Sequence, residues 1–323
     1  MKKVRNEFKS FLKNFSLPSE VKNPIIKASE SNTYVETVSN KADCLHYHLD
    51  KNYVETLTQE NTRHIKKILR LQHFGAVKII ADITEENFYG EVNSLYIHPW
   101  TGKDGIEGKY RYLVAGILFR NKILPFYVTI LMSGCFKARF LGEIADLCKS
   151  LGLNVKAMLL DRGFYSGDII DTLFLKEINY LIFVPKKQLY QSMLASADKS
   201  CVIEYAIHYT KNKSGYDAET TLALVKNCLD YDWVFASNIF FRSPEKYVYL
   251  YKQRWNIETM FRVHDEARIK TKSKNPVIRL FYFIVGMFLL LIWNLYQKTS
   301  YSFKRFVIVL CEMMRIDAEY CAD

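Results

Sequence analysis

The chain has 323 residues, 49% of them apolar, which is enough for one large domain or for a catalytic domain with helical flanks. Its formal net charge of +11 and pI near 9.1 favour a polyanionic partner, most simply nucleic acid, whose phosphates attract basic proteins regardless of sequence. Seven scattered cysteines without a Cys-x-x-Cys pair exclude a regularly spaced disulfide framework and indicate reduced thiols in an intracellular protein.

The first 75 residues are polar and carry short apolar clusters. Apolar residues recur at helical spacing within residues 65–69, so this part is predicted to be a helical DNA-binding module. Lys66, Lys67 and Arg70 either face a DNA backbone or line a solvated helix face, and the sequence favours neither alternative.

From residue 76 onward, apolar runs alternate with segments of helical spacing. Strands are predicted at 77–83, 110–119, 123–131, 155–160 and 180–184, and helices at 136–151 and 166–178. Three early strands followed by alternating helices and strands predict an α/β fold, a mixed sheet with helices against its faces. This is the strand order of the ribonuclease H-like fold.

Residues 187–244 interrupt the alternation. Three β-branched or aromatic runs, at 202–209, 220–225 and 233–239, predict an antiparallel insertion that returns to the main sheet. The start signal Ser243-Pro244-Glu245 then opens one long helix. We therefore expect an N-terminal module at 1–75, a catalytic domain at 76–275 with the β insertion at about 187–244, and a C-terminal helical region at 276–323 packing on the core.

One apolar segment, residues 280–296, is near the lower length limit for crossing a bilayer. It contains Asn294, and Arg279 and Lys298 flank it symmetrically. A buried helix of a large domain is therefore the favoured interpretation, and no membrane association is expected.

Three acidic residues stand out because of their predicted positions. Asp82 and Asp161 lie at the ends of predicted adjacent core strands, and Glu258 lies on the long helix. Taken singly, each aspartate is equally typical of a turn or a helix cap. Five residues of the predicted long helix are separated by steps of three or four and therefore project from one face: Tyr251, Arg254, Glu258, Arg262 and Asp265. The alternative is that this face is simply exposed to solvent.

Such a carboxylate set suits phosphodiester chemistry with two divalent ions, Mg²⁺ or Mn²⁺, about 4 Å apart. Asp82 and Asp161 are assigned as metal ligands, with Asp82 bridging the ions, and Glu258 completes the second position and orients the attacking water. The predicted DNA contacts are basic or phenolic side chains, namely Tyr251, Arg254, Arg262, Arg162 and Lys270.

These motifs resemble those of the DDE-type transposases of insertion sequences, in the branch with a Tyr-x-x-Arg-x-x-x-Glu signature. Tyr251, Arg254 and Glu258 match that signature, and the strings that begin at Asp161 (Asp-Arg-Gly-Phe-Tyr-Ser) and Asp82 (Asp-Ile-Thr) resemble the two aspartate motifs. The resemblance covers roughly residues 76–297 and includes the β insertion. Asp265 stands where the family often has lysine; Arg262, Arg268 and Lys270 are the nearby cations that could replace it.

The resemblance implies metal-dependent hydrolysis at transposon ends, followed by strand transfer of the 3′-hydroxyl into target DNA. It implies double-stranded DNA as the partner, a homodimer on DNA, and a cytoplasmic, nucleoid-associated protein. Two other hypotheses remain open: a nuclease of the same fold that cuts without joining, and a DNA-binding descendant that has lost catalysis.

Overall fold

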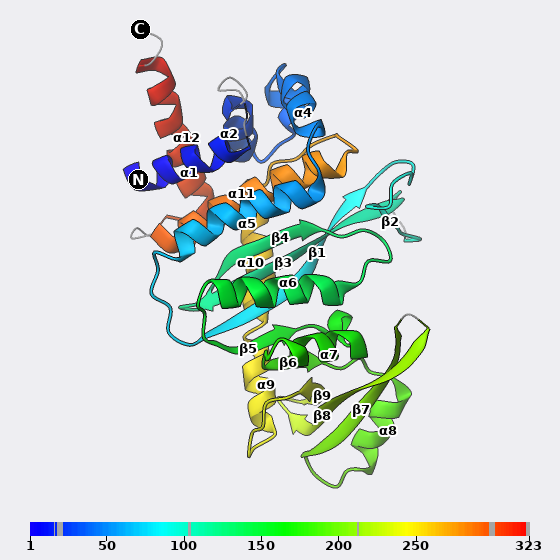
Figure 1. Cartoon of the computed structure of the whole chain (residues 1–323). Coiled ribbons are helices and arrows are strands. Elements are labelled where there is room, and N and C mark those ends of the chain that lie inside the picture. Colours follow the sequence, from blue (N-terminus) through cyan, green and yellow to red (C-terminus); the bar gives the residue numbers. More distant parts are fainter. Residues whose placement is uncertain (16, 18–21, 103–104, 212, 297–300, 321–323) are drawn as a thin grey trace. The chain divides into compact units, whose positions relative to one another are not determined.

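The computed structural model of the chain describes residues 1–15, 17, 22–102, 105–211, 213–296 and 301–320 (Figure 1). The chain forms two compact units, which are described separately. Unit 1 comprises residues 1–71, 83–133 and 258–323, and unit 2 comprises residues 72–82 and 134–257.

Unit 2 contains a mixed sheet. The N-terminal part of β1 runs parallel to β5, and β5 runs parallel to β6. The sheet then continues with antiparallel strands in the order β9, β8, β7. The strands are β1 (Val77–Phe88), β5 (Val155–Leu160), β6 (Tyr180–Phe183), β7 (Cys201–Lys211), β8 (Ser214–Cys228) and β9 (Tyr231–Ser237).

The parallel part of this sheet follows from its sequence. The last four residues of β5, Ala157–Leu160, are apolar and buried, as expected of a parallel strand covered on both faces. The helices α6 (Lys137–Ser150) and α7 (Gly167–Leu175) pack against each other in this unit. Gly152 follows α6 with φ of +66°, a conformation that L residues rarely adopt and in which glycine commonly ends a helix.

The region predicted as a β insertion contains the three expected strands. The first two are longer than predicted, and the third has the predicted length but begins two residues earlier. The helix α8 (Gln188–Ser196), which was not predicted, precedes them. β7 and β8 form a hairpin, while β9 pairs with β6 in the register Leu181 with Ser237. The predicted return to the main sheet is therefore confirmed.

The prediction of a single long helix after residue 244 is wrong. The structure has α9 (Glu245–Lys252) and α10 (Trp255–His264), separated by a turn at Gln253 and Arg254. The backbone N–H groups of Gln253, Arg254, Asn256 and Ile257 donate to carbonyls three residues back, as in a 3₁₀ turn. Asp265 also leaves the helix, because it begins a separate 3₁₀ turn, η3 (Asp265–Ala267).

Unit 1 combines helices with the remaining strands. The sheet order here is β2, β3, β1, with β4 paired to β3. The tight β3–β4 turn places Arg120 and Asn121 at φ of 51° and 59°, as a type I′ hairpin requires. The elements introduced here are α1 (Lys2–Asn14), α2 (Lys22–Ser31), α3 (Val35–Val38), α4 (Ala42–Asp50), α5 (Val54–Leu69), β2 (His98–Pro99), β3 (Gly108–Phe119), β4 (Lys122–Ile130), α11 (Pro276–Tyr296) and α12 (Phe303–Tyr320).

The core of unit 1 is built on α11. This helix and α5 pack on β4 and on each other (Figure 1). By length and composition α11 could cross a membrane, but 89% of its most apolar 18-residue window is buried inside the protein. The ring of Phe288 stacks on that of Phe11 from α1, with centroids 3.8 Å apart. This packing supports the interpretation of α11 as a core helix.

Residues 1–71 contribute α1 to α5, as the helical prediction requires. They belong to the same compact unit as residues 83–133 and 258–323. The domain boundaries at residues 75 and 275, and the role of the N-terminal helices in DNA binding, stay predictions.

Glycine at one position of α11 makes room for a buried histidine. A Cβ at Gly286 would lie 2.4 Å from Nε2 of His264, which is 1% exposed. Burial lowers the pKa of His264, so this ring packs as a neutral group.

A second buried histidine predicts acid sensitivity. Burial, with a contribution from Lys67, lowers the pKa of His64 from 6.5 to about 4. Between these values the unfolded chain binds more protons than the folded chain, so stability falls as the pH drops from 6.5 to 4. The shift corresponds to a loss of at most about 3 kcal/mol.

We expect His64→Gln to remove most of this dependence, because glutamine does not titrate. The measurement is the free energy of unfolding by denaturant, compared for both proteins between neutral pH and a pH just above the lowered pKa of His64. An equally steep pH dependence in the variant would contradict the assignment.

Candidate carboxylate site

The two aspartates singled out from the sequence lie side by side in unit 2. In the parallel pair of β1 and β5, Ala81 is opposite Leu160, so the next residues along the two strands are Asp82 and Asp161. The parallel pairing ends at this point: Asp161 directly follows β5, whereas Asp82 lies within β1, which continues to Phe88, so the prediction that Asp82 stands at a strand end is wrong. The predicted adjacency of the two strands is confirmed.

A chain of hydrogen bonds connects the two carboxylates. Arg254 donates from Nη1 to Oδ2 of Asp82 at 2.7 Å, and from Nε to the hydroxyl of Tyr251 at 3.1 Å. The Tyr251 hydroxyl donates in turn to Oδ1 of Asp161 at 3.0 Å. The side chains of Arg254 and Asp82 are 6% and 16% exposed, so their ion pair is largely shielded from water. Arg254 and Tyr251 thus link the two aspartates through hydrogen bonds.

The Tyr251 side chain is fixed by aromatic packing. Its ring lies 5.4 Å from that of Phe183 on β6 and 5.1 Å from that of Phe235 on β9, measured between centroids. Burial raises the pKa of Tyr251 far above its usual value; Arg254 opposes the shift and Asp161 adds to it. The phenol therefore stays protonated and acts as a donor to Asp161.

The solvated-face alternative is wrong for two of the five residues on the predicted helix face. Tyr251 and Arg254 are 2% and 5% exposed, and both contact the aspartates. The sequence pattern did not reveal this, because polar residues at helical spacing are compatible with either environment.

Two residues beside the site were missed. Lys78 lies four residues before Asp82 on β1 and donates from Nζ to Oε1 of Gln253 at 2.7 Å. Burial lowers the pKa of Lys78, with a further contribution from Lys156. Alternation along a strand places Lys78 and Asp82 on the same face, and a lysine within an apolar run was the only available signal.

The other predicted site residues lie elsewhere. Glu258 is exposed in the first turn of α10 and belongs to unit 1, as does the exposed Arg262. Arg162 is exposed in the 3₁₀ turn η2 (Arg162–Phe164), directly after Asp161. Lys270 is half-buried between η3 and α11. That Glu258 joins the aspartates stays a prediction.

The donor set fits a hard divalent cation. Magnesium needs only a few carboxylates and keeps waters and substrate oxygens as its other ligands, and Asp82 and Asp161 supply such carboxylates. The guanidinium of Arg254 already places positive charge against Asp82. Within the described part of the chain, no group of three or more His, Cys, Asp or Glu side chains forms a metal site on its own.

One substitution tests the tyrosine contact. We expect Tyr251→Phe to cost about 1 kcal/mol of stability, because the hydrogen bonds to Asp161 and Arg254 are lost while the aromatic packing remains. Denaturant unfolding measures the change. Tyr249→Phe, at an exposed tyrosine two residues earlier, is the matched control, and an equal effect in both variants would contradict the contact.

The chain is similar in sequence and in fold to known proteins. Residues 137–293 match the sequence model of the transposase DDE domain family. The cryo-EM structure of the piggyBac transposase synaptic complex with hairpin DNA has a similar fold, with a TM-score of 0.53 at 12% identity, covering 83% of this chain and 58% of that chain. The chain thus spans little more than half of that transposase.

A second solved structure is that of a variant of Ciona intestinalis endonuclease V in complex with a 23-mer DNA that contains an inosine. It aligns with a TM-score of 0.30 at 11% identity, over 73% of this chain and 98% of that chain. Among curated proteins, no sequence matches the chain.

The sheet and the likeness to piggyBac transposase define an α/β protein of the ribonuclease H-like class. More narrowly, residues 137–293 are similar to the transposase DDE domain, so the resemblance to DDE-type transposases is confirmed.

Proposed function

We propose that the protein is a DNA transposase. In this proposal it hydrolyses phosphodiester bonds at transposon ends with divalent metal and transfers the 3′-hydroxyl into target DNA. The observation that carries the proposal is the pair formed by Asp82 and Asp161 where the parallel pairing of β1 and β5 ends, bridged by Arg254 and Tyr251. The family match over residues 137–293 and the hairpin DNA in the piggyBac complex support DNA as the substrate.

Each residue of the site has a proposed role. Asp82 and Asp161 would hold two Mg²⁺ or Mn²⁺ ions, with Glu258 as the third carboxylate. Bound ions of this kind supply an activated water and stabilise the leaving oxygen in phosphodiester hydrolysis. Glu258 is the fourth residue after Arg254, which already contacts Asp82, and this short separation supports its assignment.

Arg254 and Tyr251 are proposed to bind substrate as well as to hold the carboxylates. A guanidinium presents several N–H donors in a planar fork, so Arg254 can keep one donor on Asp82 and direct another at a phosphate. The protonated Tyr251 hydroxyl can donate to a phosphate oxygen in the same way. Arg162, Arg262 and Lys270 are proposed as further phosphate contacts.

Assembly and location follow from the proposed reaction. Pairing of two transposon ends would require at least a homodimer on double-stranded DNA. The net charge of +11 supports association with nucleic acid, and hence a cytoplasmic, nucleoid-associated protein.

The experiment is an assay with purified protein and a supercoiled donor plasmid that carries the element's ends. We expect magnesium-dependent cleavage at the ends, and joining of pre-cleaved ends to a second plasmid. Cleavage without joining would identify a nuclease instead. Salt-sensitive DNA binding with no metal-dependent reaction would identify a DNA-binding descendant without catalysis.

A further inference from the structure

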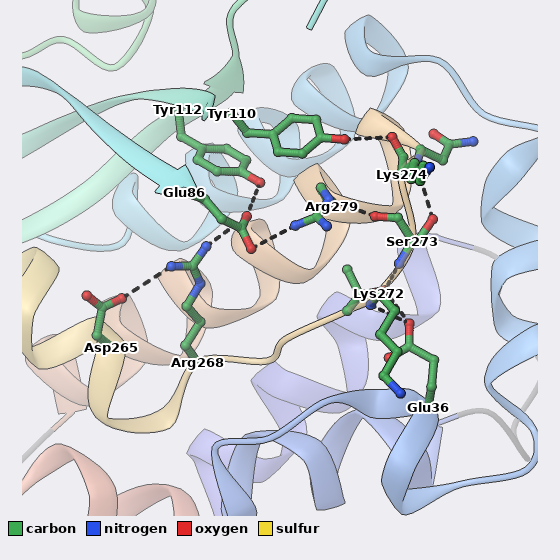
Figure 2. A network of polar contacts seen from close by, with 12 residues as sticks. Glu36, Glu86, Tyr110, Tyr112, Asp265, Arg268, Lys272, Ser273, Lys274 and Arg279 are labelled. Atoms are coloured by element: carbon green, nitrogen blue, oxygen red, sulfur yellow. Dashed lines mark hydrogen bonds and ion pairs between the residues drawn. The ribbon is translucent and has the colours of Figure 1, made fainter. Parts of the chain in front are cut away.

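A basic segment of unit 1 lies between η3 and α11. Residues 268–275 read Arg-Ile-Lys-Thr-Lys-Ser-Lys-Asn, with a basic side chain at every second position, and we call this segment the basic strap (Figure 2). It forms no helix and adds only an isolated parallel bridge between Lys270 and Tyr34. The alternation of basic residues is therefore not explained by pairing within a sheet.

Burial along the strap alternates. Ile269 and Thr271 are 3% and 5% exposed, whereas Lys272 and Lys274 lie closer to solvent and Lys270 is half-buried. Within the described residues, no carboxylate pairs with the ammonium group of any of these three lysines at 4 Å or less. The strap therefore presents three lysines on the side away from its buried residues.

The first half of the strap is anchored at α3. Oε1 of Glu36 accepts hydrogen bonds from the Thr271 hydroxyl at 2.5 Å and from the backbone N–H of Lys272 at 2.8 Å. The backbone of Lys270 donates to the carbonyl of Thr33 at 3.1 Å and accepts from the N–H of Val35 at 3.0 Å. The backbone that carries Lys270 and Lys272 is thus fixed by hydrogen bonds to residues 33–36.

The second half is anchored by arginine and tyrosine side chains (Figure 2). Arg279 donates from Nε to the carbonyl of Ser273 at 2.7 Å, and Tyr110 donates to the carbonyl of Lys274 at 2.8 Å. Glu86 pairs with Arg279 at 2.8 Å and with Arg268 at 2.8 Å. The negative charge of the largely buried Glu86 thereby offsets that of the arginines and not that of the three lysines.

We propose that the basic strap binds the phosphate backbone of nucleic acid, through Lys270, Lys272 and Lys274. Two residues of extended chain span at most about 7 Å, so the three ammonium groups can follow successive phosphates along one strand. Because hydrogen bonds already fix the backbone, little conformational entropy is lost when the strap binds. The contact is independent of base sequence. That the nucleic acid is duplex DNA rests on the proposed transposase function.

The test compares two triple variants with the same change in charge. The strap variant is Lys270→Gln, Lys272→Gln and Lys274→Gln; the control variant is Lys149→Gln, Lys199→Gln and Lys246→Gln, at three lysines of unit 2. Binding to a fluorescent duplex is measured by anisotropy in EDTA across a salt series. The slope of log K against log salt should fall in magnitude by up to about 2.7 in the strap variant, and by less than about one in the control.

Equal slopes in the two variants, or a strap slope equal to that of the wild type, would overturn the proposal. Thermal unfolding of each variant shows whether it folds, and a Lys→Arg triple at the strap should restore the wild-type slope. Binding to anionic vesicles without binding to duplex would also overturn it. EDTA keeps this binding test independent of catalysis. If the strap variant binds like the wild type while magnesium-dependent cleavage is intact, only the strap proposal is rejected. If cleavage is absent while the strap variant shows the expected loss of slope, only the transposase proposal is rejected.

Discussion

Asp82→Asn and Asp161→Asn should each lower metal-dependent DNA cleavage by at least about a hundredfold. Loss of a residue that only orients a metal ligand already costs about 10–100-fold, and these two carboxylates are the proposed ligands themselves. Asparagine keeps the shape of the side chain but removes its charge. The measurement is the rate of plasmid cleavage in Mg²⁺ under single-turnover conditions.

The control is Asp198→Asn, which removes one exposed carboxylate from the same unit. It should cleave at the wild-type rate. The rates must be measured well below the unfolding temperature of every variant, because Asp82→Asn also weakens the ion pair with Arg254. Wild-type rates in both aspartate variants would exclude the carboxylate pair as the active site.

Arg254→Met should destabilise the protein by about 3 kcal/mol, the lower end of the range for breaking a buried ion pair from one side. Arg254 is 5% exposed, and its removal takes one hydrogen-bond partner from Asp82 and one from the Tyr251 hydroxyl. The loss is costly because the remaining charge is left in a poorly solvated place. Asp82 is itself 16% exposed, which keeps the effect at that lower end.

The double variant Asp82→Asn with Arg254→Met tests the origin of this cost. If an uncompensated carboxylate causes the loss, the double variant should recover part of it, with a coupling energy of about 1–3 kcal/mol. Denaturant unfolding of the wild type, both single variants and the double variant completes the cycle. Strictly additive losses would show that Arg254 stabilises the protein by packing alone.

The strand assignments were predictable because they depend on local sequence. Ala157–Leu160 are apolar and buried, and β5 has the predicted bounds. The placement of Asp82 and Asp161 on adjacent strands followed from the same runs. β1, in contrast, extends to Phe88 and not to residue 83, because its charged residues find distant partners: Glu85 pairs with Lys109 and Arg111, and Glu86 with Arg268 and Arg279.

The break between α9 and α10 could not be predicted. No glycine or proline marks it, and the favourable periodicity runs through it. The turn at Gln253 and Arg254 accompanies inward contacts of their side chains with Lys78 and Asp82, which lie far earlier in the chain. Tertiary contacts of this kind override a helical pattern. The grouping of residues 1–71 with α11 likewise depends on long-range packing, such as the stack of Phe11 on Phe288.

The paired register of β1 and β5 has a consequence for how this gene can change. Successive side chains of a strand point to opposite faces, so deletion of one residue between Val77 and Asp82 would turn the carboxylate away from Asp161. Frame-preserving insertions or deletions should therefore be purged from these few codons, while the loop between β1 and β2 tolerates them. Length variation among related sequences would then distinguish functional genes from inactivated ones.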